Sequence, residues 1–172
     1  VKREPTPEED ESYNVPGLIT HHAAEHYLKE GQEEVFNPLV VQKAVMNYSE
    51  KPKIDLVSAY GSFDKAIEFT LKCTENMHRF LVTRGFREKK NFLCEQWFGS
   101  WDTPLMLSDN LATQGAADLI ELNDNGTAIL YDYKATWSTK NLNKDQLILY
   151  SIASERFFRR PITMSSFFLI PQ

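Results

Sequence analysis

Asp118, Asp132 and Lys134 are the residues whose types and spacing best fit a chemical site. Asp132 follows Asp118 by 14 positions and Lys134 follows Asp132 by two, in a β-rich stretch whose "NDNG" segment predicts a hairpin turn. Residues two apart in a strand project from the same face, so Asp132 and Lys134 are expected to point together. The hairpin then carries Asp118 alongside them.

Two carboxylates at close range repel each other unless a cation lies between them, and Mg²⁺ prefers such oxygen ligands. The main-chain carbonyl of Tyr133 is a candidate further ligand, and a lysine beside a metal can orient water and offset charge on a phosphate. These residue types suit metal-dependent phosphodiester hydrolysis. For an isolated D-x-K, an exposed hairpin with a cross-strand Asp–Lys pair is the better explanation, so neighbouring motifs must decide.

Three ordered motifs strengthen the catalytic interpretation: "GAAD" (115–118), "DYK" (132–134) and "QLILY" (146–150). Together they resemble the PD-(D/E)xK nucleases, and within them the RecB-like exonuclease group. The resemblance implies a restriction-endonuclease-like core, Mg²⁺ or Mn²⁺ as cofactor, and cleavage of single-stranded DNA or duplex ends in recombination, repair or replication. It also implies that Gln146 and Tyr150, which share a helical face, position Lys134 or the DNA strand.

The same group commonly carries a helix of the form G-x-x-x-H-x-x-x-E, whose histidine binds the metal. "GSFDKAIE" (61–68) resembles this helix, with Asp64 in place of the histidine, and aspartate is a suitable ligand for magnesium. Glu68 is the alternative ligand, and Glu95 resembles an acidic position on the preceding strand. Two solvated helix residues explain Asp64 and Glu68 equally well.

Basic residues after the DYK motif form a candidate phosphate-contacting strip, although a solvated helix end explains them almost as well. They are Lys140, Lys144, Arg156, Arg159 and Arg160. The iron–sulfur members of the resembled group use four cysteines, whereas this chain has two, Cys73 and Cys94, so no such cluster is expected.

Bulk composition bounds the remaining possibilities. With 172 residues, 42% of them hydrophobic, the chain suits one domain, and its net charge of −5 argues against coating nucleic acid by overall field. No apolar run approaches the roughly 20 residues that span a bilayer, so a soluble, intracellular protein without a membrane partner is expected. Residues 1–17 predict an acidic, mobile head and residues 18–172 a single nuclease-like domain, and a larger parent polypeptide or complex stays open.

The elements needed to position the site follow from hydrophobic spacing. Helices are expected within 18–29, 37–49, 61–86 and 143–158, and strands within 91–99, 116–122, 128–137 and 164–171. This order predicts an α/β fold with a small mixed central sheet flanked by helices. Two other functions stay open: a non-catalytic nucleic-acid-binding or interaction module of the same fold, and an RNA-cleaving viral-type endonuclease, against which the Q-x-x-x-Y helix argues.

Overall fold

The computed structural model describes residues 11–100, 102–136, 142 and 144–169. Its first half is helical, and its second half holds the strands. The helical elements are η1 (Glu11–Asn14), α1 (Val15–Glu30), η2 (Glu33–Phe36), α2 (Pro38–Ser49), α3 (Leu56–Tyr60) and α4 (Phe63–Thr83). They are followed by β1 (Phe92–Phe98), β2 (Leu105–Ser108), β3 (Leu111–Thr113), β4 (Gly115–Leu122), β5 (Ala128–Lys134), α5 (Lys144–Phe158) and β6 (Ile162–Leu169).

The predicted mixed α/β fold is confirmed by the central sheet, whose strand order is β1-β4-β5-β6. Strands β1, β4 and β5 pair antiparallel in sequence order, and β5 pairs parallel with β6 through the α5 crossover. The β4–β5 turn is the predicted hairpin, with Gly126 at φ 84°, a conformation that glycine adopts without strain. Strands β2 and β3 form a separate small hairpin that the sequence pattern did not indicate.

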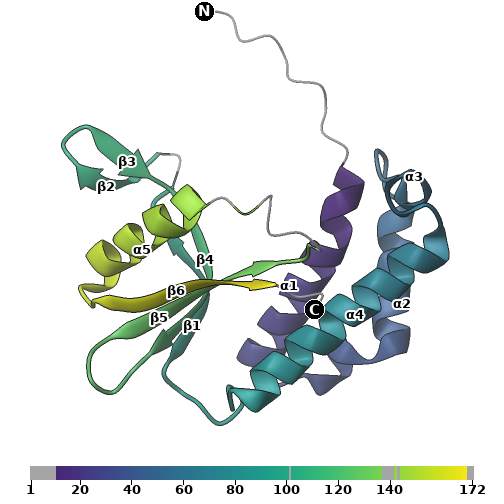
Figure 1. The fold of residues 1–172 in the computed structure, drawn as a ribbon, viewed down its shortest axis with the longest axis horizontal. Helices are drawn as coiled ribbons and strands as arrows, with labels where there is room; N and C mark the ends of the chain where they lie inside the picture. The colour runs from purple at the N-terminus through teal and green to yellow at the C-terminus, as the bar shows by residue number, and fades with distance from the viewer. Residues whose placement is uncertain (1–10, 101, 137–141, 143, 170–172) are drawn as a thin grey trace, which may run out of the picture.

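Helices cover both faces of the sheet (Figure 1). On one face, Tyr27 of α1 and Met77 of α4 pack with Leu119 and Tyr131 of the strands. On the other face, Ala153 of α5 packs in a second cluster, with Phe98, Ala117, Ile120, Ala128 and Leu130. The sheet is therefore buried on both sides, which explains why its strands are rich in apolar residues.

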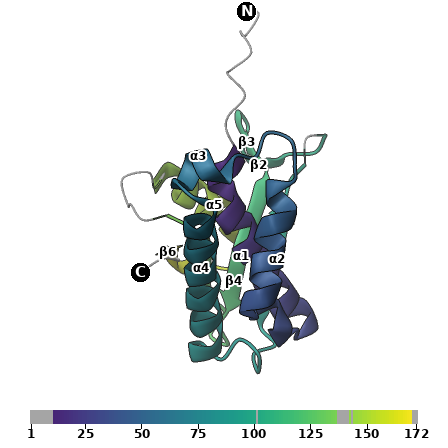
Figure 2. The same ribbon diagram turned by 90° about the vertical axis from the view of Figure 1, so that its right-hand side faces the viewer.

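Helices α1, α2 and α4 run side by side, and α3 lies at the end of this layer where α1 begins (Figure 2). In α4, buried residues recur at the three-to-four spacing of an amphipathic helix, from Ala66 to Leu81, and Ser62 caps its first turn by accepting from the Lys65 N–H at 3.2 Å. Helix α2 packs on α1 through Val41 and Val45. In the part of the chain described, no helix combines the length and apolar character needed to cross a membrane.

The fold begins earlier than the sequence predicts. The head was expected to extend through residue 17, but Ser12, Val15 and Pro16 are buried, and α1 starts at Val15. The Ser12 hydroxyl accepts a hydrogen bond from the Asp55 N–H at 2.7 Å, which attaches η1 to the α3 turn. An acidic, proline-rich composition does not reveal such a distant anchor. Residues 1–10 lie outside the described residues.

Glu121 of β4 lies in a cluster of charged and hydroxyl groups near the β4–β5 turn. Its carboxylate accepts from Arg84 at 2.6 Å, from the Tyr131 hydroxyl at 3.0 Å, and from Lys89. Burial alone would raise the pKa of Glu121, but these three hydrogen bonds outweigh it and lower the pKa below its ordinary value. The ionised carboxylate therefore contributes stability above about pH 4.5, and this contribution is lost as the pH falls through the lowered pKa.

Replacing Glu121 with glutamine is expected to lower the free energy of unfolding at pH 7 by about 1 to 2 kcal/mol, because charge-assisted hydrogen bonds are lost while Arg84 and Lys89 regain water. Urea unfolding of both proteins between pH 3 and pH 7 measures the difference, which should shrink below about pH 4. Glu75→Gln removes an exposed pair with Arg79 and serves as the control, with no measurable change expected. An equal loss in both variants would contradict the assignment.

Candidate metal centre

The candidate site lies where strands β4 and β5 separate. Their ladder runs from the Leu122–Ala128 pair to the Leu119–Tyr131 pair and then stops. Beyond this point β4 continues alongside β1 and β5 continues alongside β6. The Asp118 carboxylate takes the place of a strand partner, because its Oδ2 accepts the Tyr133 N–H at 2.5 Å. The fork between the strands thus fixes Asp118 relative to the DYK segment.

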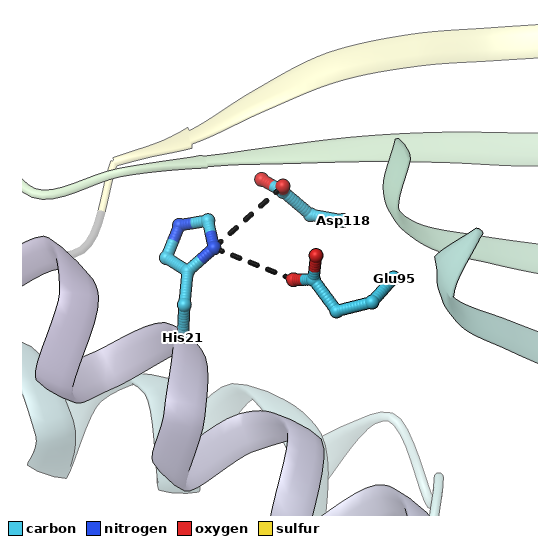
Figure 3. Close-up of side chains that lie close together, drawn as sticks. All are labelled: His21, Glu95 and Asp118. Carbon is cyan, nitrogen blue, oxygen red and sulfur yellow. Dashed lines mark ion pairs between the residues drawn. The ribbon is translucent and has the colours of Figure 1, made fainter. Parts of the chain in front are cut away.

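His21, Glu95 and Asp118 converge beside this fork from α1, β1 and β4 (Figure 3). His21 Nδ1 lies 3.6 Å from Glu95 Oε1 and 3.6 Å from Asp118 Oδ1. One ligand atom from each residue falls within 4.8 Å of the others, and among the residues described this is the single group of three or more potential metal ligands. An imidazole nitrogen and two carboxylate oxygens form a donor set for Mn²⁺ or Mg²⁺.

A hydrogen bond at Nε2 of His21 fixes the direction in which Nδ1 of the same ring points. His21 Nε2 lies 3.3 Å from the main-chain carbonyl of Tyr133, and this hydrogen bond requires a proton on Nε2. Nδ1 then faces the two carboxylates, an arrangement in which a proton or a metal ion must lie between them. A carbonyl partner that fixes the ring in this way is typical of metal-binding histidines.

The charges of the site favour a bound cation. Burial raises the pKa of Asp118 to about 6, and the nearby carboxylates of Asp132 and Glu95 act in the same direction, against His21 and the Tyr133 N–H. Burial lowers the pKa of His21, but Glu95 and Asp118 outweigh it and the net shift is upward. The carboxylates thus gain from any positive charge placed among them, and a divalent ion supplies it.

Glu95 adopts a left-handed backbone conformation, with φ 51°, in the middle of β1. The residues on either side keep their β4 partners, as Cys94 pairs with Leu119 and Gln96 with Ala117. A left-handed conformation costs a residue with a side chain about 1 to 3 kcal/mol and clusters at functional sites. At Glu95 the local strain accompanies a carboxylate directed at His21.

Asp132 and Lys134 are held together as the sequence predicts. Lys134 Nζ lies 2.8 Å from Asp132 Oδ2, and Asp132 is 3% exposed. The Tyr133 residue between them contributes its N–H to Asp118 and its carbonyl to His21. The expected role of that carbonyl as a metal ligand stays a prediction, and its contact in this structure is His21.

Gln146 and Tyr150 share one face of α5, with Gln146 Nε2 donating to the Tyr150 hydroxyl at 3.1 Å. The Tyr150 ring packs edge-on to Phe98 and covers Gly115, where an added Cβ would lie 3.2 Å from Tyr150 Cε1. A side chain at the glycine of "GAAD" would therefore make a tight contact with the tyrosine of "QLILY". These two motifs lie in contact at the start of the strand that carries Asp118.

Asp64 and Glu68 do not join the site. Both are exposed on the first turns of α4, outside the group formed by His21, Glu95 and Asp118. The residue missed is His21, although "GLITHHAAE" (17–25) matches the G-x-x-x-H-x-x-x-E spacing in full, with Gly17, His21 and Glu25. In "GSFDKAIE" the aspartate falls three positions after the glycine instead of four. The better spacing was the available signal.

The three arginines of the predicted basic strip lie away from the site. Arg156 donates to the Leu107 carbonyl at 3.0 Å, against the β2–β3 hairpin. Arg159 and Arg160 lie just before β6, whose first residue, Ile162, pairs with Ala128. Ala128 is at the opposite end of β5 from Lys134, about 20 Å away at 3.3 Å per residue. Lys144 begins α5, and Lys140 lies outside the described residues. The arginines were expected at the site because they follow the Q-x-x-x-Y motif of α5 in sequence, but this crossover helix runs away from the site.

A cavity of about 460 Å³ gives access to this centre. It is lined by His21, Glu95, Tyr133 and Lys134, and also by Tyr13 of η1. A protein-family scan and a search of curated proteins find no match to the sequence. The site is therefore interpreted from its geometry.

Proposed function

We propose that this chain is a divalent-metal-dependent nuclease domain that hydrolyses DNA phosphodiester bonds, similar to the RecB-like exonucleases of the PD-(D/E)xK superfamily. The observation that carries the proposal is the convergence of His21, Glu95 and Asp118 beside the Asp132–Lys134 pair. Exonuclease action in recombination, repair or replication is what the three motifs favour.

His21, Glu95 and Asp118 would hold Mn²⁺ or Mg²⁺, with the Asp132 carboxylate close enough to influence Asp118. The imidazole favours Mn²⁺ somewhat, because nitrogen ligands suit the later transition metals better than magnesium. When bound, the ion supplies Lewis-acid activation of the phosphate and of an attacking water. A histidine at position 21 supports the catalytic interpretation over a non-catalytic module of the same fold.

Lys134 is the residue that contributes a mobile proton and a positive charge. Asp132 holds its ammonium group, so Lys134 can orient a water and offset the negative charge that grows on the phosphate during cleavage. Tyr150 and Gln146 support the start of β4 from α5 and thereby keep Asp118 in register.

Digestion of end-labelled linear DNA, closed circular DNA and a matched RNA, each with Mn²⁺ or Mg²⁺, tests the proposal. Cleavage of linear DNA from its ends is expected. Lys134→Gln should slow cleavage about 100-fold with little change in Mn²⁺ affinity, because the ammonium acts in the transition state. Lys43→Gln, an exposed lysine of α2, is the matched control.

The alternatives give different results in the same assay. Preferred cleavage of RNA would favour the viral-type endonuclease, and cutting of closed circles would replace the exonuclease assignment by an endonuclease. Absence of cleavage of all three substrates would overturn the enzyme proposal, and absence of calorimetric Mn²⁺ binding would overturn the metal centre.

A further inference from the structure

Two tyrosines lie in contact at the edge of the metal-site cavity. The rings of Tyr13 in η1 and Tyr60 in α3 have centroids 5.9 Å apart, and the Tyr60 hydroxyl donates to the Tyr13 carbonyl at 3.2 Å. Together with the Ser12–Asp55 hydrogen bond, this contact holds η1 against α3. Tyr13 nevertheless stays 59% exposed, so its backbone is anchored while its aromatic ring is accessible to solvent.

The tyrosine pair connects two cavities. Tyr13 lines the 460 Å³ cavity that contains His21 and Glu95, and Tyr60 lines a neighbouring cavity of about 300 Å³. The remaining lining of the second cavity comes from α4: Lys65, Glu68, Phe69 and Lys72. Figures 1 and 2 place α3 and the start of α4 at the end of the helical layer where α1 begins. The Tyr13–Tyr60 contact thus lies between the cavity of the metal site and a cavity lined by two lysines.

We propose that the surface around this contact binds single-stranded DNA, with an unpaired base on Tyr13 and phosphates on Lys65 and Lys72. The proposal rests on the proposed nuclease function and specifies its substrate as a single strand. Lys65 and Lys72 are two helical turns apart, about 10.5 Å along α4, so they contact separate phosphates. Below, the surface formed by Tyr13, Tyr60, Lys65 and Lys72 is called the strand track.

Single strands suit the strand track because base stacking requires an exposed base face. In a duplex both faces are covered by neighbouring bases, whereas an aromatic side chain contributes about 1 to 3 kcal/mol per stacked base of a single strand. Aromatic rings followed by cations match this mode of binding. Glu68 also faces the second cavity, where its carboxylate opposes a phosphate. Removing the Glu68 carboxylate therefore tests whether phosphates bind in this cavity.

Fluorescence anisotropy with a labelled 12-nucleotide oligothymidylate tests the strand track in EDTA, where no divalent ion supports cleavage. Tyr13→Ala is expected to weaken binding about 5- to 100-fold, and Tyr13→Phe, which keeps the ring, should bind as the wild type does. Lys65→Gln and Lys72→Gln should each reduce the slope of log affinity against log salt concentration by about 0.7. Glu68→Gln should bind more tightly, and Lys43→Gln, on α2, should retain the wild-type slope.

The result that overturns the strand track is wild-type affinity in Tyr13→Ala, absence of oligothymidylate binding at low salt, or equal Tyr13 dependence for a blunt 12-base-pair duplex. The nuclease proposal is judged separately by cleavage. Tyr13-dependent binding without cleavage would support the track and contradict the nuclease, whereas cleavage that is indifferent to Tyr13 would do the opposite.

Discussion

Replacing Asp118 with asparagine is expected to abolish metal-dependent cleavage and to weaken Mn²⁺ binding about 1,000-fold. The substitution removes one negative charge from the centre of the ligand group. Two unit charges about 4 Å apart interact with an energy of roughly 4 kcal/mol at an effective dielectric constant near 20. This energy corresponds to about a thousandfold change in affinity. Isothermal titration calorimetry with Mn²⁺ and digestion of linear DNA measure the two effects.

The same variant carries its own control for folding. An asparagine Oδ1 can still accept the Tyr133 N–H, so the strand fork keeps its hydrogen bond. Because the pKa of Asp118 is raised to about 6, ionisation of this carboxyl group destabilises the folded protein. This destabilisation is absent below about pH 4 and grows as the pH rises to about 6. Metal-free Asp118→Asn should therefore be more stable than the wild type at pH 8, by about 1 to 3 kcal/mol. Retained cleavage in this variant would contradict the assignment of Asp118 as a ligand.

Replacing His21 with alanine is expected to lower both Mn²⁺ affinity and cleavage more than about 100-fold, whereas Asp64→Asn should leave them within twofold of the wild type. Residues that merely orient a metal ligand cost 10- to 100-fold when lost, so a direct ligand should cost more. Asp64 is exposed on α4 and contacts no member of the group. Calorimetry and cleavage of linear DNA measure both variants side by side.

His22→Ala is the matched control for this comparison, because it removes a neighbouring imidazole that is 61% exposed and directed toward Glu25. Thermal unfolding of the variants then separates loss of metal binding from loss of folding. The opposite pattern, with Asp64 required and His21 dispensable, would restore Asp64 as the metal ligand that the resemblance of "GSFDKAIE" first indicated.

The sequence predicted those parts of the fold and site that depend on local pattern. The β4–β5 hairpin follows from its turn residues and its apolar alternation, and it carries Asp118, Asp132 and Lys134 within one short segment. The α5 helix followed from its composition, and the Gln146–Tyr150 pair from a spacing of one turn. In each case the residues that decide the structure are neighbours in the chain.

Contacts between distant segments were harder to predict. His21 and Asp118 are 97 positions apart, and the motif spacing in "GLITHHAAE" was the one local signal for which of two helices packs against the strand fork. The arginines after α5 show the converse error, because residues close in sequence to Lys134 are carried to the other end of the sheet by the crossover. The ordered start of the chain likewise depends on Ser12 meeting Asp55, 43 positions away.

The left-handed backbone at Glu95 has a consequence for protein engineering. A glycine there would adopt the same φ without cost, and would also remove a carboxylate from a repulsive group. If the proposed nuclease function holds, a library of variants screened for heat resistance alone would enrich Glu95→Gly and similar changes around the strand fork, and the selected proteins would be thermostable and inactive. A useful screen of this molecule has to score turnover and melting temperature together.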